Sequence, residues 1–560
     1  MTQAFTLGID YGTNSVRALI VDTRTGEEIG TAVAGYRHGE QGIVLDPREP
    51  NLARQHPQDY IDGMLEAVAG ALKLAQGHAG FTPESIIGIG VDTTGSTPIP
   101  VDAQLRPLAL DPHFEGAPAA MAWLWKDHTS HAEATEITAF ARQEHPEYLA
   151  KCGGTYSSEW FWSKMLHCAR TAPEVFAAAY TWVEHADWMP ALLCGVTDPA
   201  QLKRGACAAG HKGMFHPSWG GFPDPAFLGA LDAGLARVRA TLPDEVYSIA
   251  EPAGGLSAEW AAKLGLREGT PVAVGAIDAH LGAVGSGIGT GTLVKIMGTS
   301  TCDIMTAPLE QGLPDIPGLC GIAVESVLPG CYGLEAGQAA VGDIFNWFVE
   351  RIQPGGQGHD ALTEEAGQLA PGESGLLALD WHNGNRTVLI DQRLTGLMLG
   401  MTLHTRPAEI YRALVEATAF GARAIIERLV EYKVPVERVI CCGGISAKNR
   451  MVMQIYADIL GRPMELSGSA QTCALGAAMA GAVAAGAAAG GHADFASAAA
   501  AMTHTHPDRF EPIPGSQAVY EKLYALYREL HDLFGQVDYS ANPAHVMKDL
   551  LEIKDAARAR

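Results

Sequence analysis

The chain has 560 residues, of which 47% are hydrophobic and 18% charged, so it is long enough for two domains and ordinary enough in composition to exclude general disorder. Its net charge of −24 argues against nucleic acid or an acidic membrane as the main partner. It leaves room for a small anionic ligand, because backbone amides and a metal can bind phosphate locally.

The first predicted elements are β-strands over Leu7–Asp10 and Val16–Val21. The turn between them contains Gly12, Thr13 and Asn14, whose backbone and side-chain donors suit phosphate oxygens. A carboxylate beside phosphates repels them unless a cation lies between, so we interpret Asp10 as facing a complex of Mg²⁺ with a nucleotide. A hairpin turn initiated by Asp is the alternative.

The next elements are a helix over Asp59–Leu74, from its apolar spacing, and a strand over Ile86–Asp92. We interpret Asp92 as structural or as shaping a pocket. Aromatic and polar residues then alternate in Trp123–Ser130 and Ser157–Met165, a pattern that suits sugar stacking and hydroxyl binding. A tryptophan-rich core at helical spacing is the alternative.

Two single polar residues stand among small ones: Lys212 in "AGHKG" and Glu335 in "GLEAGQ". Each is either a hydroxyl-binding group or part of a solvated turn. A strand over Val272–Asp278 ends in a carboxylate, which is where α/β folds place reacting groups, although Asp278 can also open a helix. The glycine-rich segment Gly282–Thr292 that follows predicts a hinge or domain junction.

Beyond that junction, strands are predicted over Thr292–Met305 and Arg438–Cys442. The first contains Gly298, Thr299 and Ser300, a candidate second phosphate loop. The second ends in Gly443 and Gly444, which permit close approach of a flat or anionic group at a helix N-terminus. Ordinary tight turns are the alternative for both. Helices are predicted over Gly337–Val349, Glu409–Glu431, Lys448–Leu460, Cys473–Val483 and Gln517–Phe534.

Strands followed by helices in both halves predict an α/β chain built twice. The chain lacks the Walker phosphate loop and the H-R-D and D-F-G motifs of protein kinases. The ten cysteines form no C-x-x-C pair, and the N-terminal stretch does not read as a signal peptide. The Ala/Gly run Cys473–Gly491 predicts a packed helix and loop rather than a membrane span. We therefore expect reduced thiols, a cytoplasmic location and no membrane partner.

Nine segments, in this order along the chain, resemble motifs of the FGGY carbohydrate kinases. They are "GIDYGTNSVRALIVD", "GVDTTGSTP", "WKDHT", "YSSEWFWSKMLH", "AGHKG", "GAIDAHLGAVG", "KIMGTSTCDI", "GLEAGQ" and "GGISAKN". The resemblance extends to about residue 490 and implies two actin-like, ribonuclease-H-like domains flanking a catalytic cleft. It places a sugar-binding domain over residues 1–286 and a nucleotide-binding domain over residues 287–545.

The resemblance also implies roles for individual residues. Asp278 matches the family's general base, and Asp10 its magnesium-associated aspartate. The matches to the nucleotide-binding loops are Gly12, Thr13, Asn14, Gly298, Thr299, Ser300, Gly443, Gly444 and Asn449. The matches to the sugar-binding positions are Ser96, Trp125, Lys126, Lys212, Asp278 and Glu335.

From this resemblance we expect ATP- and Mg²⁺-dependent phosphorylation of the C5 hydroxyl of L-ribulose, giving L-ribulose 5-phosphate in arabinose catabolism. Another ketopentose or polyol, such as D-ribulose or xylulose, is the nearest alternative substrate. A non-catalytic, actin-like nucleotide-binding protein is an alternative of a different class. A homodimer is the default expectation for the assembly.

Overall fold

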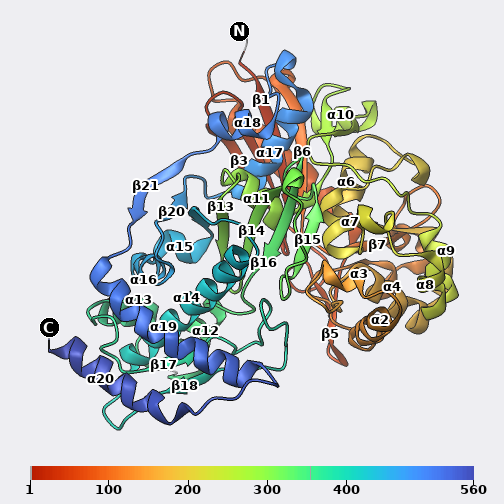
Figure 1. The fold of residues 1–560 in the computed structure, drawn as a ribbon. Helices are drawn as coiled ribbons and strands as arrows, with labels where there is room; N and C mark the ends of the chain where they lie inside the picture. The colour runs from red at the N-terminus through yellow and green to blue at the C-terminus, as the bar shows by residue number, and fades with distance from the viewer. Residues whose placement is uncertain (1–2, 354, 560) are drawn as a thin grey trace.

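Two mixed β-sheets form the framework of the computed structural model, which describes residues 3–353 and 355–559 (Figure 1). The strands of the first sheet are β1 (Phe5–Tyr11), β2 (Ser15–Asp22), β3 (Glu28–Gly35), β6 (Ile86–Thr93), β10 (Pro252–Gly255), β11 (Pro271–Ala273) and β12 (Ala276–Ile277). Those of the second are β13 (Thr292–Met297), β14 (Thr301–Pro308), β15 (Gly321–Val324), β16 (Cys331–Ala336), β19 (Arg438–Cys442), β20 (Met464–Ser467) and β21 (Thr505–Phe510).

The two sheets share one topology. The first has the order β10–β11–β6–β1–β2–β3, with β12 also paired to β6, and the second has the order β15–β16–β14–β13–β19–β20–β21. In each, the first strand is antiparallel to the next one along the chain and parallel to a later one: β1 to β2 and β6, and β13 to β14 and β19. The prediction of an α/β chain built twice is therefore confirmed.

Three small sheets and twenty α-helices complete the described part of the chain. The small sheets are β4 (Val44–Asp46), β5 (Glu49–Gln55) with β8 (Ala122–Trp123); β7 (Pro98–Val101) with β9 (Thr181–Glu184); and β17 (Leu377–Leu379) with β18 (Leu397–Leu399). The helices before the second sheet are α1 (Pro57–Ala75), α2 (His131–Glu144), α3 (Glu147–Ala150), α4 (Phe161–Thr171), α5 (Pro173–Ala178), α6 (His185–Leu193), α7 (Ala206–Lys212), α8 (Pro225–Leu231), α9 (Ala233–Arg239), α10 (Ala258–Leu264) and α11 (Asp278–Gly285). The later helices are α12 (Gly342–Trp347), α13 (His359–Gly367), α14 (Pro407–Glu431), α15 (Gly444–Lys448), α16 (Arg450–Leu460), α17 (Thr472–Ala485), α18 (Phe495–Met502), α19 (Pro514–Gly535) and α20 (Val546–Arg558).

Most predicted helices are confirmed within a few residues, as α1, α14, α17 and α19. The prediction over Gly337–Val349 was wrong at its start, because the chain forms no helix between the end of β16 at Ala336 and the start of α12 at Gly342; its end continues into a π-helical turn over Phe348–Ile352. The helix predicted over Lys448–Leu460 is confirmed as α16, which begins two residues later because the Asn449 side chain caps it by accepting from the Val452 N–H at 3.1 Å; the short helix α15 before it was not predicted.

Helix α17 packs on the first sheet, although it follows β20 of the second sheet in the chain (Figure 1). Gly8 and Gly90 permit this contact: an added Cβ at either position would overlap a carbonyl oxygen of α17, that of Ala474 or Ala477. In return α11, which follows the first sheet, contacts β13 and β14 of the second. The two helices therefore cross between the sheets and join the two halves.

The glycine-rich junction is only partly a connection. Gly282 and Gly285 lie within α11, and an added Cβ at Gly285 would overlap the carbonyl oxygen of Thr472 in α17. The connection is therefore shorter than the segment predicted as a hinge or domain junction, because Gly282–Gly285 belong to α11 and serve close helix packing. The remaining residues connect α11 to β13, and the domain limits 1–286 and 287–545 stay a prediction.

Throughout residues 3–353 and 355–559, no helix combines the length and the apolar character needed to cross a lipid bilayer. The Ala/Gly run is α17 and the turn after it, and α17 is almost wholly buried inside the protein.

Candidate active site

Three carboxyl groups converge at one edge of the first sheet. Asp10 of β1 and Asp92 of β6 are register partners on neighbouring parallel strands, so their side chains lie on the same face. Asp278 follows β12, which pairs with the same end of β6, and it opens α11. The strand predicted over Val272–Asp278 is thus broken, and the helix-opening interpretation of Asp278 is confirmed.

The pKa values of these carboxyl groups reflect burial and mutual repulsion. Asp92 is completely buried and neither of its oxygens has a hydrogen-bond donor, so burial, with the charges of Asp10 and Asp278, raises its pKa well above the usual range. Burial also raises the pKa of Asp10, against the opposing effects of Asp92 and of Arg17, whose guanidinium lies 3.3 Å away. Burial first, and Asp10 second, raise the pKa of Asp278 to about 7.

The turn between β1 and β2 lies beside this cluster. The Gly12 N–H donates to the Ser15 carbonyl at 3.0 Å, and the Asn14 side chain donates to the Gln41 carbonyl at 2.7 Å. The Thr13 hydroxyl accepts a hydrogen bond of 3.1 Å from the indole N–H of Trp125. Trp125 therefore contacts the candidate phosphate loop. This hydrogen bond joins a predicted sugar-binding residue, Trp125, to a predicted nucleotide-binding residue, Thr13.

The corresponding edge of the second sheet carries small, neutral turns. The turns Gly298–Ser300 and Gly443–Gly444 follow the parallel strands β13 and β19, so they lie at the same end of the sheet. Gly443 has φ 96°, and an added Cβ there would overlap the carbonyl oxygen of Met297. Gly298, Thr299 and Gly444 are exposed, although the Gly298 N–H donates to the Ser300 carbonyl within the turn at 2.9 Å. Asn449, by contrast, is committed to its cap and donates to the Thr363 hydroxyl at 3.1 Å.

The Cys473 thiol shows that these two edges meet. Cys473 lies in the first turn of α17. Its pKa is raised well above the usual range by burial and then by the negative charges of Asp10, Asp92 and Asp278, with a smaller effect of Cys442 at the end of β19. One side chain therefore lies near the acidic cluster of the first sheet and near the glycine turn of the second.

A buried ion-pair cluster around Glu335 connects the two halves. Lys212 of α7 places its ammonium nitrogen 3.1 Å from a carboxylate oxygen of Glu335 on β16, and Arg386 pairs with the other oxygen. Burial opposes ionisation, but Lys212 and Arg386 together hold the pKa of Glu335 well below its usual range. The interpretation of Lys212 and Glu335 as solvated turns is excluded, because both are buried.

Two histidines complete that cluster. His211 and His280 each place a ring nitrogen 3.7 Å from Glu335, and burial lowers the pKa of His280 to about 4. The nitrogen and oxygen atoms of these three side chains lie within 4.8 Å of one another. Because Lys212 and Arg386 already neutralise the carboxylate, the arrangement fits an ion-pair cluster better than a site for a divalent ion.

The remaining predicted sugar-binding residues differ in exposure. Ser96 is fully buried and donates its hydroxyl proton to the Glu184 carboxylate. Trp125 is exposed and Lys126 partly exposed. The tryptophan-rich core alternative is correct for the rest of these segments, whose buried indoles are Trp123, Trp160 and Trp162.

Five residues near these groups were missed as candidates: Lys164, Glu184, His211, His280 and Arg386. Lys164 stands inside "SSEWFWSKM" and His280 inside "GAIDAH", so both were visible as polar residues within motifs. No sequence pattern marks Glu184 or Arg386, because only the tertiary structure brings them to Ser96 and Glu335.

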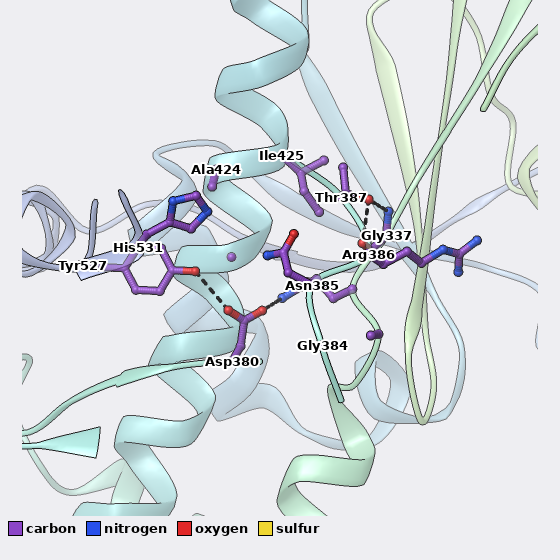
Figure 2. Close-up of a pocket in the computed structure, with 13 residues that line it drawn as sticks. Gly337, Asp380, Gly384, Asn385, Arg386, Thr387, Ala424, Ile425, Tyr527 and His531 are labelled. Atoms are coloured by element: carbon purple, nitrogen blue, oxygen red, sulfur yellow. Dashed lines mark hydrogen bonds between the residues drawn. The ribbon is translucent and has the colours of Figure 1, made fainter. Parts of the chain in front are cut away.

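A small cavity in the second half lies behind Arg386 and contains none of the predicted site residues (Figure 2). Its wall includes the Asp380 carboxylate, which accepts hydrogen bonds from Gln338 Nε2 at 2.8 Å and the Tyr527 hydroxyl at 2.9 Å. These buried bonds are satisfied within the protein, so we interpret them as structural.

The paired sheets, the crossing helices and the turns at their meeting edges are those of a two-domain, actin-like fold. The sequence patterns of the N-terminal and C-terminal domains of the FGGY family of carbohydrate kinases match residues 5–285 and 293–485, respectively. The chain belongs to this family and is a phosphotransferase.

Its relatives extend over nearly the whole length. A ribulokinase of Shouchella clausii is 41% identical over 99% of this chain and 98% of its own, and a ribulokinase of Geobacillus thermodenitrificans is 41% identical over 100% and 99%. Among solved structures, a xylulose kinase from Rhodospirillum rubrum superposes with a TM-score of 0.77 at 25% identity, covering 95% of this chain and 99% of its own.

Proposed function

We propose that this protein transfers the γ-phosphoryl group of ATP to the C5 hydroxyl of L-ribulose. The substrate class is supported by the full-length relatives named ribulokinase. The single observation that carries the mechanism is Asp278: a partly exposed carboxyl group, with its pKa raised to about 7, near both Asp10 and the Lys212–Glu335 pair. A base with such a pKa is suited to accept a proton at neutral pH.

The acidic cluster suits a magnesium ion. Burial and the charges of neighbouring carboxylates raise the pKa values of Asp92 and Asp278, so a cation held by Asp10 would relieve part of that repulsion. Mg²⁺ bound there would neutralise the charge of the phosphates during transfer. Asp10 is the residue that would hold it, with Asp92 behind.

The chain's own groups would act on the sugar and the nucleotide as follows. The turns at Gly12–Asn14 and Gly298–Ser300 would direct backbone N–H groups at phosphate oxygens from the two sheets. Gly443 and Gly444 leave room for the nucleoside beside α15. Ser96, Lys212 and Glu335 would hold sugar hydroxyls, with Trp125 and Lys126 at the rim.

Asp278 would accept the proton of the C5 hydroxyl as that oxygen attacks the γ-phosphorus. Phosphoryl transfer has a loose transition state, so positioning and charge neutralisation should contribute most of the acceleration. For the sugar to reach Lys212 and Glu335, its hydroxyls must replace part of their mutual ion pair. We therefore expect sugar binding to loosen a contact between the halves that exists without it.

The test is a coupled assay of ADP release with L-ribulose, D-ribulose, L- and D-xylulose, the pentitols and glycerol, giving kcat/KM for each. We expect L-ribulose to have the highest value. A higher kcat/KM for another ketopentose would show that this sugar is the substrate, and the proposed phosphoryl transfer would still hold. ATP turnover that no polyol stimulates would refute the proposal.

We also propose a cytoplasmic homodimer, on the basis of the unpaired cysteines and of the general prevalence of symmetric dimers. Light scattering coupled to size exclusion tests the assembly: a mass near twice 59.1 kDa supports it, and a monomer mass contradicts it.

A further inference from the structure

Ser96 makes all its polar contacts with two buried charged residues that the proposed mechanism does not use. Glu184, at the end of β9, is 5% exposed, and Lys164, in the first turns of α4, is completely buried. Glu184 accepts from the Ser96 hydroxyl, and Lys164 donates to the Ser96 carbonyl at 2.8 Å. The hydroxyl and the carbonyl of Ser96 are therefore both fixed by buried charged side chains.

Glu184 determines the direction of the Ser96 hydrogen bond. Its second carboxylate oxygen accepts from the Thr97 N–H at 2.8 Å, so the carboxylate faces two donors and acts only as an acceptor. Burial raises the pKa of Glu184, but the bonds from Ser96 and Thr97 and the charge of Lys164 oppose that rise. A hydroxyl has one hydrogen, and Ser96 gives its own to Glu184, so only its lone pairs remain for a ligand. Because Ser96 is completely buried without a sugar, the sugar must displace the atoms that cover it in order to reach them.

Lys164 sets the place of Ser96 relative to the Trp125–Lys126 segment. Besides the Ser96 carbonyl, its ammonium donates to the Leu124 carbonyl at 2.9 Å and to the Trp123 carbonyl at 3.2 Å. Three carbonyl acceptors match the three N–H donors that only the charged form supplies. Burial lowers the pKa of Lys164 to about 7, and the nearby Glu184 carboxylate opposes that shift. One side chain thus ties two chain segments that carry candidate sugar-binding residues.

Stability alone is a weak reason for this arrangement. A buried pair of opposite charges often contributes no more than apolar residues of similar size would, because both charges lose their hydration. Buried charged residues can, however, hold a polar group in a fixed orientation next to a ligand site, which apolar residues cannot do.

We propose that Glu184 and Lys164 are positioning residues of the sugar site, Glu184 making Ser96 an acceptor for a sugar hydroxyl and Lys164 fixing Ser96 against the Trp125 segment. The inference rests on the proposed function and adds to it a rule of recognition. At the sugar position facing Ser96 the ligand must donate a hydrogen bond.

Glu184→Gln tests the acceptor role with an isosteric change. The Thr97 N–H can only donate, so it keeps the amide oxygen, and the amide NH₂ turns toward Ser96. Ser96 then accepts from the glutamine, and its own hydrogen points to the sugar, which reverses the bond. We expect the KM for the sugar to rise about tenfold or more, with the KM for ATP within about twofold of wild type.

A series of deoxyfluoro ketopentoses gives a readout that a purely structural role would not move. Fluorine cannot donate a hydrogen bond, so wild type should discriminate strongly against the analogue fluorinated at the position that faces Ser96. In Glu184→Gln that discrimination should shrink about tenfold, because Ser96 has become a donor. Unchanged discrimination at every position would overturn the acceptor role.

Asp380→Asn is the matched control, because Asp380 is also a buried carboxylate with two donors, in the cavity of the second half (Figure 2). It should change Tm without changing the KM for the sugar. Lys164→Met should raise that KM about tenfold or more and also lower kcat, because the two segments lose their common tether. Arg412→Met is its control: Arg412 is a buried cation that donates to Glu416, Ala366 and Tyr520 in the second half.

The outcomes separate this inference from the proposed function. Wild type that phosphorylates no ketopentose or polyol overturns the proposed function, and with it the sugar site. Active wild type with sugar KM values unchanged in both Glu184→Gln and Lys164→Met overturns the positioning roles alone. Equal rises in the KM values for sugar and ATP would show general damage and would also count against them. If Lys164→Met does not fold, Glu184→Gln and the fluorinated series decide.

Discussion

The two halves of this protein use one sheet topology for two kinds of chemistry. At the edge where the halves meet, the first sheet presents Asp10, Asp92 and Asp278, with the pKa of each raised by burial. The equivalent edge of the second sheet presents the small neutral turns Gly298–Ser300 and Gly443–Gly444. The duplicated scaffold therefore places an acidic edge opposite a neutral one.

This difference has a physical use in phosphoryl transfer. The carboxyl groups of the first sheet suit a bound cation and a proton acceptor, while the exposed, uncharged turns of the second sheet do not repel anionic phosphates. Two acidic edges would repel the nucleotide, and two neutral ones would supply no base. The following predictions test whether the two edges divide the work in this way.

The largest effect is expected for Asp278→Asn, which removes the proton acceptor from the acidic edge with little change in shape. We expect kcat to fall by about 10²–10⁴-fold, with smaller changes in the affinities for sugar and ATP. Steady-state kinetics with isothermal titration calorimetry measures both. Near-normal turnover would remove Asp278 from the base role.

A change at the contact that joins the halves should lower stability. In Gly90→Ala the new methyl group must displace α17, because it would overlap the carbonyl oxygen of Ala477. We expect the free energy of unfolding to fall by about 1–3 kcal/mol or more, measured by denaturant titration. Gly35→Ala in β3 is the control, since an added Cβ there meets no atom within 4 Å. Equal effects of the two changes would contradict the close packing of α17.

The acidic edge should also control the pH dependence of the wild type. The pKa of Asp278 is raised to about 7, and a base acts only when unprotonated, so kcat/KM should fall about tenfold per pH unit below that value. The fall should be absent from the residual activity of Asp278→Asn, which controls for the ionisation of ATP itself. A kcat/KM that stays constant between about pH 5 and pH 8 would contradict the role of Asp278 as the base.

The smallest effect is expected on the neutral side, at Asn449. In Asn449→Ala the cap of α16 is lost, and the free energy of unfolding should fall by about 1 kcal/mol. Asn449→Asp keeps the capping oxygen and should fall less. Thermal denaturation compares the two variants, and an equal loss in both would show that the bond to Thr363, rather than the cap, is the larger contribution.

The local sequence pattern was enough to predict most of the strands, helices and turns. Apolar runs of four to eight residues predicted β1, β2, β6 and β19, because such runs are typical of buried strands, and amphipathic spacing predicted α1 and α14. Local pattern failed where a glycine can indicate either a flexible connection or close packing of two helices. Gly282 and Gly285 suggested flexibility, but they lie in α11, where the absence of a side chain permits contact with α17.

The sequence by itself was enough to predict the doubled α/β architecture, the family and the candidate residues at strand ends. This was possible because strand periodicity and turn chemistry are local properties of a chain. Only the tertiary structure decided that Asp92 joins Asp10, that Glu335 is shared by Lys212 and Arg386, and that Glu184 and Lys164 hold Ser96. Those contacts join residues from tens to more than a hundred positions apart. Register, helix crossing and burial create them, and no local pattern records how distant segments pack.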